Sequence, residues 1–356
     1  MDRYRIVHWG TGNVGSLALR CAMQRPDFEI VGHYVHNPEK CGRDSAELVG
    51  LPPCGLMTTD DIDSLIAIQP DVLAWFGNAM FDPLQAARTF ARFLEAGINV
   101  VTTGLYELGS AAAAPPEFRD VIEPACRKGG STVYSTGYDP GFATSQLAAT
   151  CYGIAHEIAQ VRLQEFADYG AYPDEQTMRE YMGFGQPMDY ESSLSSGAMQ
   201  RRVWTPTVFD NARMLGMDVE EYAFRFEAYP ALADRDTAIG TIEQGTVSVV
   251  SFELIGVVDG KERIVLEHLN WMHADDIPGH CPAPPLYDGS IAPVGYRLKI
   301  IGTPSVAVEI QVPSTADGLL GTALHALNAI PTVVTAEAGI LSQMDVKPYA
   351  PVRLTA

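Results

Sequence analysis

A glycine-rich segment near the beginning of the chain has the residue types and spacing of a phosphate-binding turn. It fits the pattern G-x-G-x-x-G and consists of Gly10, Thr11, Gly12, Asn13, Val14 and Gly15. The segment lies between a predicted strand at 4–9 and a predicted helix at 16–25, which is the context that a dinucleotide site needs. Gly10 would permit the tight bend, Gly12 the approach of backbone N–H groups to a pyrophosphate, and Gly15 close helix packing. A glycine turn without a ligand is the alternative, but the strand and helix spacing favours a dinucleotide.

The end of the second predicted strand, at 28–35, indicates which dinucleotide binds. An NAD site usually places Asp or Glu there to bind the ribose hydroxyls. This chain offers hydrogen-bond donors instead, namely His36, Asn37 and Lys40, with Arg43 beyond. Such donors suit the negative 2′-phosphate of NADP. The donors therefore favour NADP. Glu39 is an acidic residue in the same segment and argues against this preference, so NAD stays possible.

A carboxylate follows the fourth predicted strand, at 98–103. Ligands of open α/β sheets bind at the carboxyl ends of the strands, so Thr103 and Gly104 should face the nicotinamide end of the cofactor. Glu107 comes next, between apolar neighbours, and is a candidate acid or base with a tuned pKa. Its alternative role is the N-cap of the next helix. After the third predicted strand, at 72–76, a second loop is expected to line the cofactor through Phe76, Gly77 and Asn78.

Aromatic residues suggest where an apolar substrate pocket would form. Tyr138 and Phe142 lie in a glycine- and proline-rich corner after a predicted strand at 132–135. Tyr169 and Tyr172 follow the first strand of the later half, where ordinary surface or core tyrosines are an equal alternative. Such a pocket would suit a small, mostly apolar substrate.

Metal binding and covalent catalysis are not expected. The candidate metal ligands His268, His273, His280 and Cys281 have no standard spacing. The chain contains no G-x-S-x-G nucleophile motif, and no cysteine lies in a motif that would mark it as a nucleophile.

The order of the predicted elements indicates two domains. Strands and helices alternate up to about residue 145, which predicts a doubly wound parallel sheet of the Rossmann type. Later strands follow one another mostly without helices and predict an α+β domain on a mostly antiparallel sheet; they lie at 161–166, 246–258, 262–272, 296–301 and 306–312. A late helix at 316–330 would return to the first domain. The expected divisions are 1–145 for NADP binding, 146–313 for substrate and dimerisation, and 314–356 as the returning segment.

Composition and charge limit the function further. The chain has 356 residues, 47% of them hydrophobic, and a formal net charge of -20, which disfavours nucleic acids and anionic membranes as partners. Six cysteines without a C-x-x-C pair are typical of a reduced, cytoplasmic protein. No apolar stretch of about 20 residues is apparent, and the first predicted strand leaves no room for a signal peptide.

Several motifs taken together resemble the dihydrodipicolinate reductase-like NAD(P)-dependent dehydrogenases, closest to the bacterial native amine dehydrogenases and 2,4-diaminopentanoate dehydrogenase. The motifs are GTGNVG at Gly10, VHNPEKCGRD at Val35, TTGLYE ending at Glu107, STGYDPGF at Ser135, and NAIP at Asn328 with AEAGI after it. The resemblance implies NADP, a homodimer and reversible reductive amination, with Glu107 as the essential carboxylate and Asn328 in the substrate pocket. The HHxxKxD segment of true dihydrodipicolinate reductases is missing.

Three functions remain open at this stage. The first is amine dehydrogenation, in which small ketones or aldehydes react with ammonia. The second is oxidation of an amino acid such as 2,4-diaminopentanoate, which needs a cation for the substrate carboxylate; the candidates are Arg162, Arg179, Arg201 and Arg202. The third is a redox sensor that binds NADP without turnover. None of these arginines has a spacing that points at the pocket, which favours the first function. A carboxylate at Glu107 agrees with it, because a lysine there would repel a cationic iminium.

Overall fold

The computed structural model describes residues 3–80 and 82–346. The chain divides into two compact units. The first consists of Met1–Phe142 with Leu319–Ala356, and the second of Ala143–Gly318. The divisions therefore fall a few residues from the expected positions at 145 and 313.

The first unit is built on a parallel sheet with the strand order β16-β5-β4-β3-β1-β2. All of its neighbouring strands run parallel, which confirms the predicted doubly wound class. The strands are β1 (Tyr4–Trp9), β2 (Phe28–Tyr34), β3 (Val72–Trp75), β4 (Asn99–Thr102), β5 (Thr132–Ser135) and β16 (Gly339–Leu341). Only β16 is absent from the sequence-based expectation.

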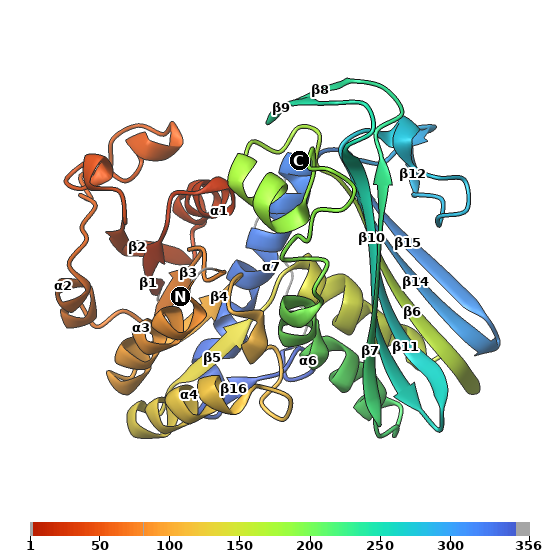
Figure 1. Cartoon of the computed structure of the whole chain (residues 1–356). Helices are drawn as coiled ribbons and strands as arrows, with labels where there is room; N and C mark the ends of the chain where they lie inside the picture. Colours follow the sequence, from red (N-terminus) through yellow and green to blue (C-terminus); the bar gives the residue numbers. More distant parts are fainter. Residues whose placement is uncertain (1–2, 81, 347–356) are drawn as a thin grey trace. The chain divides into compact units, whose positions relative to one another are not determined.

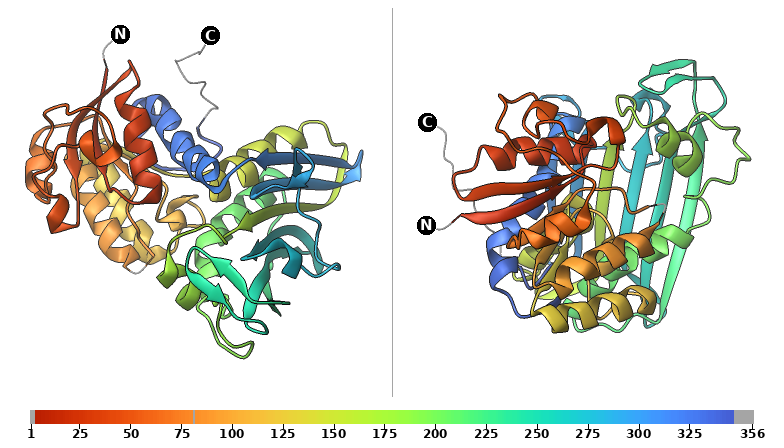
Figure 2. Two further views of the ribbon diagram at one scale, coloured as in Figure 1. Left: turned by 90° about the horizontal axis from the view of Figure 1, so that it is seen from above. Right: turned by 90° about the vertical axis from the view of Figure 1, so that its left-hand side faces the viewer.

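Helices cover both faces of this sheet (Figure 1). On one face α3 (Pro83–Glu95) and α4 (Pro116–Gly129) bury apolar side chains such as Phe90 and Phe118. On the other face α1 (Asn13–Met23) and α7 (Thr315–Thr335) pack against the same strands, and Figure 2 shows these two helices side by side. The short helix α2 (Ile62–Ala67) adds Leu65 to the first of these cores.

Helix α7 corrects one expectation from the sequence. It is long and apolar enough to cross a membrane by length and composition, whereas no such stretch was expected. One helix of this kind is weak evidence for a membrane span. Its residues Leu327 and Ile330 are fully buried in the core of the first unit, so α7 has a structural role there.

The second unit is built on a six-stranded sheet with the order β15-β14-β6-β11-β10-β7. Four of its neighbouring pairs are antiparallel, and β11 and β6 are parallel. This agrees with the predicted mostly antiparallel sheet. The strands are β6 (Glu157–Asp168), β7 (Glu221–Pro230), β10 (Val247–Val258), β11 (Lys261–Trp271), β14 (Val294–Thr303) and β15 (Val306–Val312). Asp259 and Gly260, both with positive φ, form the hairpin turn between β10 and β11.

One face of this second sheet is covered by α6 (Ala198–Met214) (Figure 1). Pro206 lies inside α6, so the proline does not end the helix. Two small hairpins, β8 (Arg235–Thr237) with β9 (Gly240–Ile242) and β12 (Leu286–Tyr287) with β13 (Ser290–Ile291), extend beyond the main sheet. Shorter helical segments of this unit are α5 (Leu147–Tyr152), the π-helical η5 (Thr177–Met182) and the 3₁₀ helix η6 (Ala274–Asp276). The segment η4 (Tyr138–Gln146), which is interrupted by non-helical residues at 139–141, precedes α5.

Candidate active site

The glycine turn has the geometry that its pattern predicts. Gly10 has a φ of +101°, a conformation that L side chains rarely adopt. A Cβ at Gly15 would lie 2.6 Å from the carbonyl oxygen of Gly10, so only glycine lets α1 approach the turn this closely. A Cβ at Gly12 would meet nothing within 4 Å. The space beside Gly12 is therefore open, as the approach of a pyrophosphate requires.

The start of α1 suits an anionic group. Gly12 is the N-cap and provides no side chain to bind the first amides of the helix. The first turn also contains no acidic residue. Backbone N–H groups at a helix N-terminus attract phosphate, both as donors and through the helix dipole. The chain thus fits the diphosphate of a dinucleotide at this position.

A buried histidine, His8, contacts the backbone of the turn. The sequence analysis did not recognise it. His8 is fully buried, and burial lowers its pKa to about 3, so its ring is neutral. Its Nε2 donates a hydrogen bond of 2.9 Å to the carbonyl oxygen of Gly10, and its ring stacks on Phe76. A histidine directly after two apolar residues of β1, two positions before the first glycine, was the signal that could have identified it.

The donors after β2 lie close to this turn. Lys40 Nζ donates to Thr11 Oγ1 at 2.9 Å, so its ammonium group reaches the glycine-rich segment. Asn37 is the N-cap of the short helix η1 (Pro38–Lys40), and its side-chain oxygen accepts from the amide of Glu39. His36 is exposed. Of the three predicted donors, Lys40 is the one whose contact with the turn the structure records.

The loops after β3 and β4 are shaped by one indole ring. A Cβ at Gly77 or at Gly104 would lie 2.6 Å from the ring of Trp75, which explains why both positions are glycine. The Gly104 carbonyl accepts hydrogen bonds from Thr102 Oγ1 and Ser135 Oγ at 3.1 and 3.0 Å. The loop after β4 is therefore fixed from two neighbouring strands.

The other predicted cofactor residues have local roles. Thr103 is buried and precedes Gly104 in this fixed loop. The side-chain oxygen of Asn78 accepts a hydrogen bond from the backbone amide of Met80, with 2.8 Å between oxygen and nitrogen. Asn13 and Val14 form the first turn of α1.

Glu107 lies in a short 3₁₀ turn, η3 (Tyr106–Leu108), that follows β4. Only 3% of its surface is exposed, and its neighbours Leu105 and Leu108 are also buried. The alternative reading as the N-cap of the next helix is wrong, because the N-cap of α4 is Pro115. Glu107 is thus a buried acidic residue that follows the carboxyl end of the central strand β4. It lies in the same unit as the glycine turn.

The predicted pocket aromatics belong to different units, Tyr138 and Phe142 to the first and Tyr172 to the second. Tyr138 and Phe142 meet edge to face, with ring centroids 6.2 Å apart, and Phe142 also contacts His325 of α7. The sequence analysis had not singled out His325. Tyr172 packs against Tyr169 and the core of the second unit, which is the ordinary role considered for it.

Asn328 is placed differently from the other pocket candidates. Its side-chain oxygen accepts from Arg25, which also pairs with Asp27 just before β2 begins. That contact lies at the edge where the parallel strands start, opposite the glycine turn. We therefore leave Asn328 out of the proposed site.

Three of the four arginines considered for a substrate carboxylate have contacts within the second unit. Arg162 pairs with Glu267 at 2.7 Å, and Arg179 pairs with Glu175 at 3.1 Å. Arg201 lies over the ring of Phe224. Arg202 also has an electrostatic interaction or hydrogen bond. These contacts favour structural roles over recognition of an amino acid.

A glycine turn on a parallel sheet, a buried acid behind β4 and a separate sheet domain define a two-domain dehydrogenase. The 2,4-diaminopentanoate dehydrogenase C-terminal domain family matches residues 143–353. An amine dehydrogenase from Streptomyces virginiae is 34% identical over 354 residues, which cover 96% of this chain and 95% of that protein. The chain belongs to this family of amine and 2,4-diaminopentanoate dehydrogenases, which are oxidoreductases acting on CH–NH₂ groups.

More distant relatives agree with the fold. A 2,4-diaminopentanoate dehydrogenase from Acetoanaerobium sticklandii is 20% identical over 365 residues, covering 97% of this chain and 94% of that protein. The solved structure of an amine dehydrogenase from Mycobacterium smegmatis superposes with a TM-score of 0.78 at 19% identity, covering 98% of this chain and 97% of that one. The likeness to Rossmann-type dehydrogenases implies a nicotinamide cofactor.

Proposed function

We propose that the protein is an NADP-dependent amine dehydrogenase that catalyses the reversible reductive amination of small ketones or aldehydes with ammonia. The observation that carries this proposal is the buried Glu107, which follows strand β4. Strand β1 of the same sheet leads into the glycine turn. The 34% identity to an amine dehydrogenase supports the same reaction. The 2,4-diaminopentanoate-type reaction is the weaker alternative, because Arg162, Arg179 and Arg201 already have contacts within the second unit.

Glu107 has three tasks in this reaction. As a carboxylate it accepts a proton from ammonium, so that ammonia can attack the substrate carbonyl. The same group returns the proton to the hydroxyl of the carbinolamine, which leaves as water. The carboxylate then stabilises the cationic iminium, and burial strengthens this interaction by excluding water. The nicotinamide, when bound, supplies the hydride.

The first test is NADPH oxidation by the purified protein. A panel of small aldehydes and ketones is measured with and without excess ammonium at mildly alkaline pH. We expect turnover that requires ammonium. Turnover without ammonium would mean a carbonyl reductase, and NADPH binding without any turnover would indicate an amino-acid substrate or a redox sensor.

The preference for NADP over NAD is proposed to depend on Lys40. Its ammonium group lies at the glycine turn, where it can pair with a 2′-phosphate. Lys40→Ala should raise the KM for NADPH about 10- to 100-fold, the usual value of a charge-assisted hydrogen bond, and should change the KM for NADH much less. Arg20→Ala, at an exposed position on α1, is the matched control. An equal loss for both cofactors would contradict the assignment.

We also propose a cytoplasmic homodimer that assembles through the second sheet. Helix α6 covers one face, and the opposite face carries a network in which Arg162 and Arg225 pair with Glu253 and Glu267. The outer strands β7 and β15 leave edges that proteins normally protect. Sedimentation equilibrium at micromolar concentration should give twice the mass of one chain. A single-chain mass under those conditions would exclude the dimer.

A further inference from the structure

Three polar residues share the face of the second sheet that α6 covers. Glu165 on β6 pairs in register with His268 on β11, and Asn270 lies two residues further along β11. Paired residues of neighbouring parallel strands point to the same face, so all three side chains do so. Their neighbours on this face, such as Leu163 and Leu266, are buried and apolar. Polar groups buried in the middle of an apolar face cost stability unless they are hydrogen-bonded or paired.

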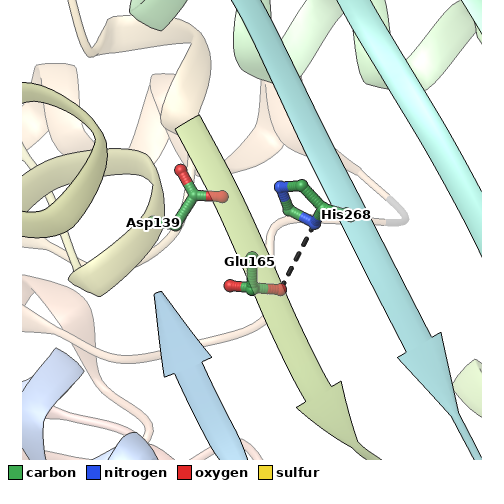
Figure 3. A group of neighbouring side chains, drawn as sticks. All are labelled: Asp139, Glu165 and His268. Atoms are coloured by element: carbon green, nitrogen blue, oxygen red, sulfur yellow. Dashed lines mark ion pairs between the residues drawn. The ribbon is translucent and has the colours of Figure 1, made fainter. Parts of the chain in front are cut away.

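The first two members are fixed by contacts within the second unit. His268 Nδ1 lies 3.2 Å from the carboxylate of Glu165, and Figure 3 shows the two side chains facing each other. The imidazole stacks on Phe252 with ring centroids 4.5 Å apart, and its other side meets the edge of Trp204 at 4.9 Å. The orientation of the Glu165 carboxylate is therefore set by a rigid histidine. The side chain of Glu165 is 13% exposed.

The third member has an unsatisfied donor. Asn270 is 1% exposed, and its Nδ2 has no hydrogen-bond partner among residues 3–80 and 82–346. Buried amide groups nearly always have a partner in the protein, in water or in a ligand. An unpaired donor on the same sheet face as a fixed carboxylate thus points to a ligand that completes the cluster.

The required ligand chemistry follows from the two groups. Asn270 Nδ2 needs a hydrogen-bond acceptor, and the Glu165 carboxylate accepts hydrogen bonds and repels anions. A carboxylate ligand would be repelled by Glu165, and an ammonium ligand has no acceptor for Asn270. A hydroxyl group provides both an acceptor oxygen and a donor hydrogen.

We propose that Glu165, His268 and Asn270 form a subsite for a hydroxyl group of the substrate. The preferred carbonyl compounds are then hydroxyketones or hydroxyaldehydes, and the amines are amino alcohols. This inference rests on the proposed amine dehydrogenase function and names its substrate class. Glu165 and Asn270 bind the hydroxyl, and His268 is a positioning residue.

The test compares substrates that differ only in the hydroxyl group. Hydroxyacetone is paired with 2-butanone, 4-hydroxy-2-butanone with 2-pentanone, and 5-hydroxy-2-pentanone with 2-hexanone, each with ammonium and NADPH. In at least one pair the hydroxyl compound should have a kcat/KM about tenfold higher. The keto acid 4-oxopentanoate should be the slowest substrate. A preference for the methyl compound in every pair would overturn the proposal.

Variants separate recognition from packing. Asn270→Leu keeps the shape but removes the donor, so the ratio of kcat/KM within the preferred pair should fall to about one. Gln164→Leu is the control, because Gln164 precedes Glu165 but binds Glu267 on the opposite face. It should leave the ratio unchanged. If Asn270→Leu does not fold, Asn270→Ala serves the same comparison, and an unchanged ratio in the folded variant would refute the subsite.

Failure of the proposed function would be distinguishable from failure of the subsite. If no carbonyl compound reacts, calorimetry with the NADP-loaded protein compares 3-amino-1-butanol with 2-aminopentane. Tighter binding of the amino alcohol, lost in the Asn270 variant, would support the subsite without turnover. Equal affinities of the wild-type protein for the two amines would exclude it.

Discussion

Glu107→Gln should lower kcat for reductive amination by about 10²- to 10⁴-fold, the usual contribution of a general acid–base group. The amide has nearly the same volume as the carboxylic acid, so the buried site between Leu105 and Leu108 stays filled. It cannot accept a proton from ammonium, and it does not stabilise a cationic iminium as a carboxylate does. The affinity for NADPH should remain within about threefold of the wild-type value, because the glycine turn and Lys40 are unchanged.

The measurement combines steady-state kinetics with a fluorescence titration of NADPH. Glu117→Gln is the matched control, because Glu117 is an exposed acid in the first turn of α4. The control should keep both turnover and cofactor affinity. Near-native turnover of Glu107→Gln would refute the catalytic assignment, whereas a loss of NADPH binding would indicate a structural role.

Local patterns were sufficient to predict five of the six strands of the first unit, β1 to β5. Strand β1, the glycine turn and α1 follow directly in sequence, and each has a strong signal: an apolar run, a motif, and helical periodicity. Glu107 could be singled out for the same reason, since it follows a strand whose carboxyl end must face the ligand edge. These inferences needed no contact between distant residues.

Other features depend on distant contacts and gave no local signal. The bond between Arg25 and Asn328 joins residues 303 positions apart, and it places Asn328 at the strand-start edge. The parallel pairing of β6 with β11 brings Glu165 beside His268, although neither residue lies in a recognisable motif. Helix α6 continues through Pro206, and its packing on the sheet keeps it continuous there.

Two glycines of the same turn should respond differently to alanine. Gly12→Ala is expected to raise the dissociation constant of NADPH at least about tenfold while leaving the free energy of unfolding unchanged or raised by up to about 1 kcal/mol. Gly12 has a φ of −78° and ψ of −169°, which alanine adopts readily, and a Cβ there meets no protein atom within 4 Å. The methyl group would occupy only the space that the pyrophosphate needs.

Gly15→Ala should instead destabilise the protein itself. Its Cβ would lie 2.6 Å from the Gly10 carbonyl oxygen and 2.9 Å from the carbonyl carbon, so α1 or the turn must move. Overpacking of this kind costs about 1–3 kcal/mol. Urea denaturation without cofactor measures the stability of both variants, and NADPH titration measures their affinity. Wild-type affinity in a folded Gly12→Ala variant would show that the dinucleotide does not approach the backbone at Gly12.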